Sequence, residues 1–278
     1  MASLFVVGTP IGNLEDLSQR VIRVLREADR IAAEDTRHTK KLLTHLGIHG
    51  KPLESIESHQ IAARVEGLVA RLLNGESIAL VTDAGMPGVS DPGSLLVRAA
   101  RERGVRVESV PGPSAVTTAV AASGLVDGPF RFVGFLPRKG SSRAEALELI
   151  RYTAEAVVLF EAPSRAQRTL ADLAANQPTR ECCVGRELTK LHEEFVWGTL
   201  SELSARDSWR GELTLVLGPY AEIRASLTDA DVDREIRRGL DLGLRAKELA
   251  QELAEQTGRP KRELYQRVLE LSSDNPDG

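Results

Sequence analysis

Three turns rich in glycine and proline follow apolar runs of this sequence, and each could hold a ligand through main-chain groups. They are Gly8-Thr-Pro-Ile-Gly12-Asn, residues 82–93 and Pro111-Gly-Pro-Ser-Ala115. The apolar runs before them are typical of strands buried on both faces. In open α/β sheets the carboxyl ends of the strands line the ligand crevice. The alternative is a set of ordinary strand-to-helix connections, although an ordered loop as long as residues 82–93 is uncommon without a function.

The longest turn places Thr82 and Asp83 where the strand 78–81 should end. Five of the next ten residues are Gly or Pro, so a helix cannot resume before Asp91. We therefore predict Asp91 as the N-cap of the following helix and Pro92 as its first residue.

A second polar segment, residues 34–41 (E-D-T-R-H-T-K-K), follows the predicted strand 30–33 and supplies candidate acids, bases and cations. It falls at another predicted carboxyl end. The alternative is a solvated loop and first helical turn, with Asp35 or Thr36 as the cap. That alternative explains the acidic residues better than it explains Arg37, Lys40 and Lys41.

Several cofactor classes are disfavoured by spacing. The first turn lacks the G-x-G-x-x-G pattern of dinucleotide sites, and Pro10 removes an N–H where a pyrophosphate would need one. We expect neither a nicotinamide nor a flavin dinucleotide. The five histidines are scattered without metal-ligand spacing, so no metal is expected. The neighbours Cys182 and Cys183 should point to opposite faces of a strand, as two buried thiols rather than a disulfide.

Composition indicates a soluble globular protein of a reducing cytoplasm. The chain has 278 residues, 42% of them hydrophobic and 27% charged, and a net charge of −4. This is enough chain for two domains with their own cores. No apolar run approaches the roughly 20 residues of a membrane span, and residues 4–7 are too short for a signal peptide. The acidic average does not exclude RNA, because a local basic patch suffices to bind it.

The order of elements predicts an α/β fold. Strands and helices alternate up to Gly124, which predicts a parallel sheet with helices on both faces. Later strands with hairpin spacing predict a second domain with a mixed sheet. From Thr228 the chain reads as three helices with a helix-turn-helix outline. Residues 228–277 carry 9 Lys/Arg against 12 Asp/Glu, which favours packing or dimerisation over nucleic-acid binding for this tail. We predict domains at 1–115, 116–222 and 228–278.

Six motifs in order resemble the tetrapyrrole-methylase superfamily, and within it the branch that 2′-O-methylates a decoding-centre cytidine of 16S rRNA. They are V-G-T-P-I-G-N-L-E-D-L, A-E-D-T-R-H-T, T-D-A-G-M-P-G-V-S-D-P-G, P-G-P-S-A, G-F-L-P-R-K and G-R-E-L-T-K. The resemblance implies a homodimer that holds S-adenosylmethionine in a cleft between two α/β domains, with the small ribosomal subunit as partner. The A-E-D-T-R-H-T segment and the C-terminal helices favour the rRNA branch.

The resemblance also implies a set of cofactor residues: Pro10, Asp83, Gly85, Met86, Pro87, Val89, Ser114, Ala115, Arg186 and Leu213. One departure stands out. Superfamily members acting on tetrapyrroles usually carry Gly-Asp-Pro where this chain has Gly85-Met86-Pro87. The acidic contact to the cofactor must then be lost or supplied by another residue such as Asp83.

The chemistry of such a reaction needs alignment and help with a proton. The sulfonium already activates the methyl group, so the protein must align the acceptor oxygen and exclude water. A ribose 2′-hydroxyl is a weak nucleophile, so a base or nearby cation should assist. The catalytic candidates on the predicted cleft loops are Asp35, Arg37, His38, Lys139 and Glu187, with Glu161 beside them and Asp35 slightly preferred as proton acceptor. The candidates for the RNA backbone are Arg37, Arg138, Lys139, Arg143, Arg165 and Lys190. For each, the alternative is a surface ion pair.

Two other functions stay open at this level. One is methylation of a small molecule of the tetrapyrrole type, which the polar positions Arg37, His38 and Lys139 disfavour. The other is a non-catalytic ribosome-assembly factor that binds RNA and keeps the fold as a scaffold.

Overall fold

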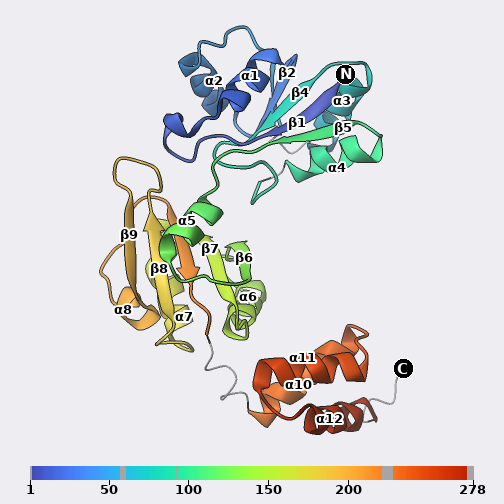
Figure 1. The fold of residues 1–278 in the computed structure, drawn as a ribbon, viewed down its shortest axis with the longest axis vertical. Helices are drawn as coiled ribbons and strands as arrows, with labels where there is room; N and C mark the ends of the chain where they lie inside the picture. Colours follow the sequence, from blue (N-terminus) through green and yellow to red (C-terminus); the bar gives the residue numbers. More distant parts are fainter. Residues whose placement is uncertain (1, 57–60, 92, 221–227, 274–278) are drawn as a thin grey trace.

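The computed structural model describes residues 2–56, 61–91, 93–220 and 228–273. Within them the chain forms two α/β units, each built on a five-stranded sheet, and a helical unit at the C-terminal end. Figure 1 shows the second α/β unit between the first unit and the C-terminal helices. The predicted fold class is therefore confirmed.

The first sheet is entirely parallel and has the strand order β3-β2-β4-β1-β5. Its strands are β1 (Ser3–Val7), β2 (Arg30–Ala33), β3 (Leu53–Ser55), β4 (Ile78–Val81) and β5 (Arg106–Val110). Its helices are η1 (Leu14–Asp16, a 3-10 turn), α1 (Gln19–Glu27), α2 (Thr36–His45), α3 (Ile61–Leu73) and α4 (Ser94–Glu102). Because all the strands run the same way, their carboxyl ends meet at one edge of the sheet.

Strand β4 shows why this sheet needs helices on both faces. All four of its residues are buried. Ile78 and Leu80 pack into the core beneath α3 and α4, whereas Ala79 and Val81 pack into the core beneath α1 and α2. The uninterrupted apolar run that predicted a doubly covered strand is thus divided between two cores.

One predicted helix boundary is wrong. Helix α4 begins at Ser94 with Gly93 at the N-cap position, two residues after the predicted cap. Asp91 instead accepts the backbone N–H groups of Gly88 (2.7 Å) and Gly93 (2.6 Å). Its carboxylate therefore closes the loop before the helix rather than capping the helix. Pro92, the predicted first residue of this helix, lies outside the described residues.

The second sheet is mixed, with the order β6-β7-β10-β8-β9. Only β6 and β7 pair in parallel, and the other neighbours are antiparallel, as predicted. Its strands are β6 (Phe130–Phe135), β7 (Ala156–Glu161), β8 (Glu181–Arg186), β9 (Glu194–Thr199) and β10 (Leu213–Leu217). Its helices are α5 (Ala115–Ser123), α6 (Ser141–Arg151), α7 (Pro163–Ala174) and α8 (Leu200–Ser204).

Cys182 and Cys183 confirm the alternation expected of a strand. Both are buried and unpaired, and they enter different hydrophobic clusters on the two faces of the second sheet. Burial raises the pKa of both thiols, that of Cys183 to about 11. They are packing residues rather than reactive groups.

The C-terminal unit consists of α10 (Asp229–Asp241), α11 (Ala246–Thr257) and α12 (Lys261–Ser273). The three helices share a hydrophobic cluster of their own, which includes Ile236, Leu253 and Val268. Thr228 and Asp231 form a capping box at the start of α10, a feature that fixes a helix start through its own side chains. The unit thus has the internal core that separate folding requires.

Candidate active site

A cavity of about 420 Å³ lies between the two α/β units. The first unit lines it with the loop after β4, and the second lines it with the start of α5, the ends of β6 and β7, and residues 212–214. Its volume falls within the range of small-molecule sites. It therefore occupies the position at the carboxyl edge of the first sheet where the sequence predicts a ligand.

Backbone contacts bring the three glycine- and proline-rich turns together at this cavity. Thr9 and Gly85 exchange two backbone hydrogen bonds, of 2.9 and 3.1 Å. The Thr9 hydroxyl donates to the carbonyl oxygen of Thr82 (3.0 Å). A Cβ atom built on Gly8 would lie 2.7 Å from Gly112, and one on Gly112 would lie 2.8 Å from Gly8. The glycines are thus required for the approach of the turns to one another.

Helix α5 directs its first turn toward the same cavity. Ser114 occupies the N-cap position, but its side chain makes no capping hydrogen bond. Ser114, Ala115 and Val116 all line the cavity. Because the first amides of a helix have no partner within it, they are available to a carboxylate or another acceptor.

One wall of the cavity is acidic. Glu34 accepts the Thr82 hydroxyl at 2.5 Å and the Asp83 backbone N–H at 3.2 Å. Asp83 in turn accepts the backbone N–H of Asp35 at 3.1 Å. Burial, opposed in part by that hydrogen bond and helped by the charges of Glu34 and Asp35, raises the pKa of the Asp83 carboxyl. This wall joins the ends of β2 and β4.

A further carboxylate, that of Glu161, is buried at the end of β7. Its oxygens accept the Thr169 hydroxyl (2.6 Å) and the Ala162 N–H (2.8 Å), and Arg165 lies 3.2 Å away. Arg165 also donates to the carbonyl oxygen of Leu136 at 2.5 Å. Glu161 and Arg165 therefore tie the end of β7 to the segment that follows β6.

Two predicted RNA contacts take part in this internal network instead. Arg143 is 5% exposed, and its guanidinium donates to Asp172 (2.7 Å), Thr169 (3.1 Å) and the carbonyl oxygen of Pro137 (3.1 Å). The prediction that Arg143 faces RNA is wrong, because its charge is buried and neutralised within the second unit. Arg165 is half-buried against Glu161, so its role is also internal.

The structure brings together most of the predicted cofactor residues. Seven of them line the cavity: Asp83, Gly85, Met86, Val89, Ser114, Ala115 and Leu213. Pro10, Pro87 and Arg186 do not line it. Arg186 pairs in register with Leu213, and its guanidinium contacts Glu194 at 2.9 Å.

The predicted catalytic residues lie outside the cavity lining. The Asp35 carboxylate receives three hydrogen bonds from the Arg37 side chain and one from its backbone, the shortest at 2.7 Å. These bonds lower the pKa of Asp35 to about 2. Glu187 accepts the Glu212 N–H (2.8 Å) and contacts Lys190 (3.2 Å), and its pKa is lowered mainly by the backbone bond. His38, Arg138 and Lys139 are exposed.

Sequence reasoning missed several lining residues as site residues. They are chiefly Ile11, Glu34, Phe135, Phe160, Ala162, Pro163 and Thr214. Glu34 gave a detectable signal, because it stands directly after a buried strand within a charged motif. The phenylalanines gave none, since an aromatic residue in a strand is equally suited to a core.

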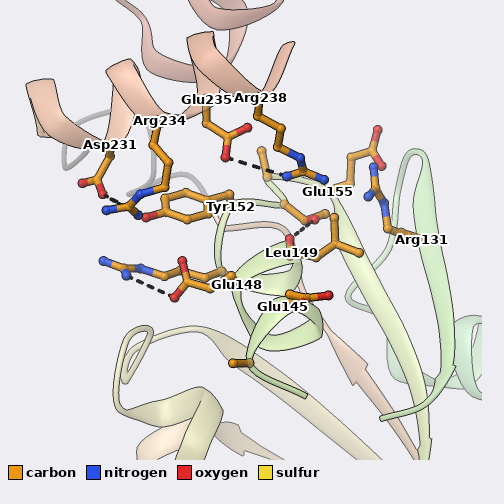
Figure 2. Close-up of a pocket in the computed structure, with 14 residues that line it drawn as sticks. Arg131, Glu145, Glu148, Leu149, Tyr152, Glu155, Asp231, Arg234, Glu235 and Arg238 are labelled. Carbon is orange, nitrogen blue, oxygen red and sulfur yellow. Dashed lines mark hydrogen bonds and ion pairs between the residues drawn. The ribbon is translucent and has the colours of Figure 1, made fainter. Parts of the chain in front are cut away.

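A larger cavity, about 920 Å³, lies between α6 and α10 (Figure 2). Figure 2 shows Asp231 and Arg234 of α10 beside Tyr152, and Glu235 and Arg238 of the same helix facing Leu149 and Glu155. The Tyr152 hydroxyl lies 3.1 Å from Asp231. Four arginines and five acidic residues line it. Because those charges nearly balance, this groove lacks the field that would attract an anion.

In the described part of the chain, no group of three or more His, Cys, Asp or Glu side chains could hold a metal ion. None of the described helices has the length and apolar character to cross a membrane.

Comparison with known proteins gives the class. Residues 3–204 match the family Tetrapyrrole (Corrin/Porphyrin) Methylases, and residues 227–272 match the RsmI C-terminal HTH domain. The fold is shared with a diphthine synthase (TM-score 0.60, 19% identity, 78% of this chain and 90% of that one). It is shared too with a uroporphyrin-III C-methyl transferase from Thermus thermophilus complexed with S-adenyl homocysteine (TM-score 0.55, 20% identity, 78% and 97%). The chain is a member of the tetrapyrrole methylase family.

Full-length relatives narrow the class. Proteins named ribosomal RNA small subunit methyltransferase I are 42% identical in a Synechocystis species (99% of this chain, 100% of the relative) and 38% in Bacillus subtilis (95% and 93%). One from Thermotoga maritima is 44% identical over 78% of this chain and 98% of its own length. Within the tetrapyrrole methylases, this chain belongs to the ribosomal RNA small subunit methyltransferase I family.

Proposed function

We propose that this protein uses S-adenosylmethionine to methylate the ribose 2′-hydroxyl of a cytidine in 16S rRNA. The observation that carries the proposal is the cavity enclosed by the Thr9–Gly85 backbone bridge and the start of α5, in a chain related over its whole length to rRNA methyltransferases. When bound, S-adenosylmethionine supplies a methyl group already activated by its sulfonium.

The lining residues fit the parts of that cofactor. The uncapped first turn at Ser114 and Ala115 offers amides to an amino-acid carboxylate. Ile11, Met86 and Leu213 provide apolar surface of the kind that holds a flat base. Gly85, with φ +81°, keeps its backbone bare at the approach to the cavity. The chain's task is then to orient the acceptor hydroxyl and to exclude water.

The C-terminal helices, which we propose as a separate domain at residues 228–278, are assigned to RNA engagement. Their match to a helix-turn-helix domain supports this assignment over dimerisation. The cofactor cavity is lined by residues 11–214 alone, so these helices are not needed to complete it. We further propose a homodimer acting on the small subunit or its RNA, which light scattering of the purified protein would test.

The direct test is methyl transfer to 16S rRNA and to small subunits from cells lacking the enzyme. Mass spectrometry of the nucleosides should show one new 2′-O-methylcytidine. A methyl group on a base, or transfer only to a tetrapyrrole, would contradict the proposal. RNA binding without any transfer would instead indicate a non-catalytic assembly factor.

Cofactor binding is tested by calorimetry with Gly85→Val, which should abolish binding because the side chain fills the approach and strains the backbone. Gly47→Val is the matched control. Gly47 is also left-handed (φ +64°) but has open space around it, away from the cavity. S-adenosylmethionine should bind the native protein far more tightly than NAD, FAD or ATP. If both variants lose binding equally, the loss comes from backbone strain at a left-handed glycine and not from the position of Gly85 at the cavity.

A further inference from the structure

We propose that Asp83 accepts the proton from the acceptor hydroxyl during methyl transfer. The inference rests on the proposed function and replaces Asp35, the preferred candidate from sequence. It starts from the five acidic residues that line the cavity: Glu34, Asp83, Asp91, Glu161 and Glu212.

Three of these acids are committed to other partners. Both oxygens of Asp91 accept loop amides, those of Gly88 and Gly93. Both oxygens of Glu161 are held, by Thr169 and by Ala162 with Arg165. Glu212 is 78% exposed and lies 3.1 Å from Lys190. None of the three combines a free oxygen with a sheltered position.

Glu34 is the closest competitor, but its contacts make it a support for Asp83. One of its oxygens accepts both the Thr82 hydroxyl and the Asp83 backbone N–H. Those bonds hold the end of β4 in place, two residues before Gly85. Glu34 therefore fixes the backbone from which the Asp83 side chain projects.

Asp83 has the geometry of a base that is oriented but not saturated. Its Oδ1 accepts the Asp35 N–H at 3.1 Å. Within the described residues, Oδ2 has no hydrogen-bonding partner. The side chain is half-buried at the carboxyl end of β4 and lines the cavity. One oxygen thus sets the direction of the carboxylate while the other can receive a proton.

Burial makes the Asp83 carboxylate a stronger base than an ordinary aspartate. Burial and the negative charges of Glu34 and Asp35 raise its pKa, and only the hydrogen bond from Asp35 and the charge of His38 oppose them. The other acids of the lining, Asp91, Glu161 and Glu212, add negative charge to the same cavity. A stronger base is more effective at removing a proton from a weakly acidic hydroxyl. Asp35, with a pKa of about 2, is a poor base by comparison.

The step balances without a further reactant. The acceptor oxygen forms a bond to the methyl carbon while the bond from that carbon to sulfur breaks. The electron pair of the broken bond stays on sulfur, which becomes a neutral thioether. The proton of the hydroxyl moves to Asp83 and is later released to water.

The test is the single-turnover rate of methyl transfer against pH, in the full-length protein with saturating S-adenosylmethionine and rRNA. Asp83→Asn should be slower by roughly 10²–10⁴-fold, the usual loss for a general base. Its cofactor affinity should stay close to native, as expected when only a transition-state interaction is removed. The native rate should fall as pH drops through the Asp83 pKa, and this acidic limb should vanish in Asp83→Asn. Asp83→Glu keeps a carboxylate and should restore part of the rate together with the limb.

Glu34→Gln separates a base from a structural support. Removing its charge lowers the pKa of Asp83, so the acidic limb should move to lower pH while transfer continues. A fully active Asp83→Asn variant would overturn the inference, as would loss of cofactor affinity with an unchanged single-turnover rate. Loss of the limb in Glu34→Gln but not in Asp83→Asn would reassign the base to Glu34. If the native protein transfers no methyl group to rRNA, the proposed function fails first and the inference falls with it.

Discussion

Asn13 donates its backbone N–H to the hydroxyl of Thr189, 3.0 Å away and 176 residues further along the chain. This bond joins the first turn of one α/β unit to the β8–β9 loop of the other. Gly12 lies against the same loop, where a Cβ atom would meet the Lys190 side chain and come within 2.9 Å of the Thr189 hydroxyl. We therefore expect Gly12, which does not line the cavity, to set how closely the two units approach on either side of it.

Gly12→Ala should push the two units apart at this contact. We expect S-adenosylmethionine affinity to fall by about tenfold, corresponding to roughly 1.4 kcal/mol, within the usual cost of overpacking. Gly67→Ala in α3 is the control, because nothing lies within 4 Å of the added methyl group. That control should bind normally and gain up to about 1 kcal/mol of stability. Calorimetry and thermal unfolding of both variants check the prediction, and unchanged binding in Gly12→Ala would contradict it.

Arg143→Met should act on stability rather than on RNA binding. The change removes a buried guanidinium bonded to Asp172, Thr169 and Pro137. We expect a loss of about 3 kcal/mol in the free energy of unfolding, at the low end for a broken buried pair because Asp172 is partly exposed. Urea unfolding measures the loss.

Exposed Arg138 provides the opposite control. Arg138→Ala should change stability by less than about 0.5 kcal/mol. If its guanidinium neutralises one phosphate, the salt dependence of RNA binding should flatten by about one unit of slope. The assignment of Arg143 to the interior is refuted if Arg143→Met flattens that slope and its urea unfolding midpoint equals that of the native protein.

The Asp35 carboxyl should titrate far below its usual range. Hydrogen bonds from Arg37 lower its pKa to about 2 in the folded chain, against the usual 3.8 of an aspartate. A lowered folded-state pKa contributes stability that is present above about pH 3.8 and is lost as pH falls through about 2. Carbon NMR of the carboxyl should show no titration between pH 7 and 3. In Arg37→Ala the midpoint should rise toward 3.8, and a native midpoint near that value would rule out the ion pair in solution.

A chain ended after Tyr220 should bind S-adenosylmethionine normally and lose rRNA methylation. The end point keeps the contacts of Arg180, which donates to the Gly218 carbonyl oxygen at 2.7 Å, and the bond from Tyr220 N–H to Ala154. Tyr152→Phe, which removes only the hydrogen bond to Asp231, is the matched variant in the full chain and should stay active. Loss of cofactor affinity in a folded truncated protein would mean that the C-terminal helices support the cavity.

The strands could be predicted because a buried strand is recognised from its own run of apolar residues. Ile78–Val81 is apolar throughout and lies between two helical layers, and the glycine- and proline-rich turns follow it directly. The roles of individual charges were not predictable in this way. Arg143 and Arg138 are both basic residues near one loop, and only the position of Asp172 and Thr169 on α7 decides which of them is buried.

Asp35 and Asp83 show the same limit at the candidate site. Both are acids after buried strands, so sequence could not rank them as bases. Their order as bases depends on side-chain surroundings. Arg37 donates hydrogen bonds to Asp35 and lowers its pKa, whereas burial raises the pKa of Asp83. These are properties of side-chain placement, and they become visible only in the folded unit.

The strand order also governs when the site can form during synthesis. Among the described residues β1 pairs with β4 and β5, and β5 ends at residue 110. At roughly 5–20 residues per second, β1 waits on the order of 5 to 20 seconds on the ribosome for both partners. Until then its apolar side chains are open to chaperones and to other nascent chains. The contact between Gly8 and Gly112 cannot form earlier, so a nascent chain should gain cofactor binding only after the whole first unit and its partner sheet have emerged.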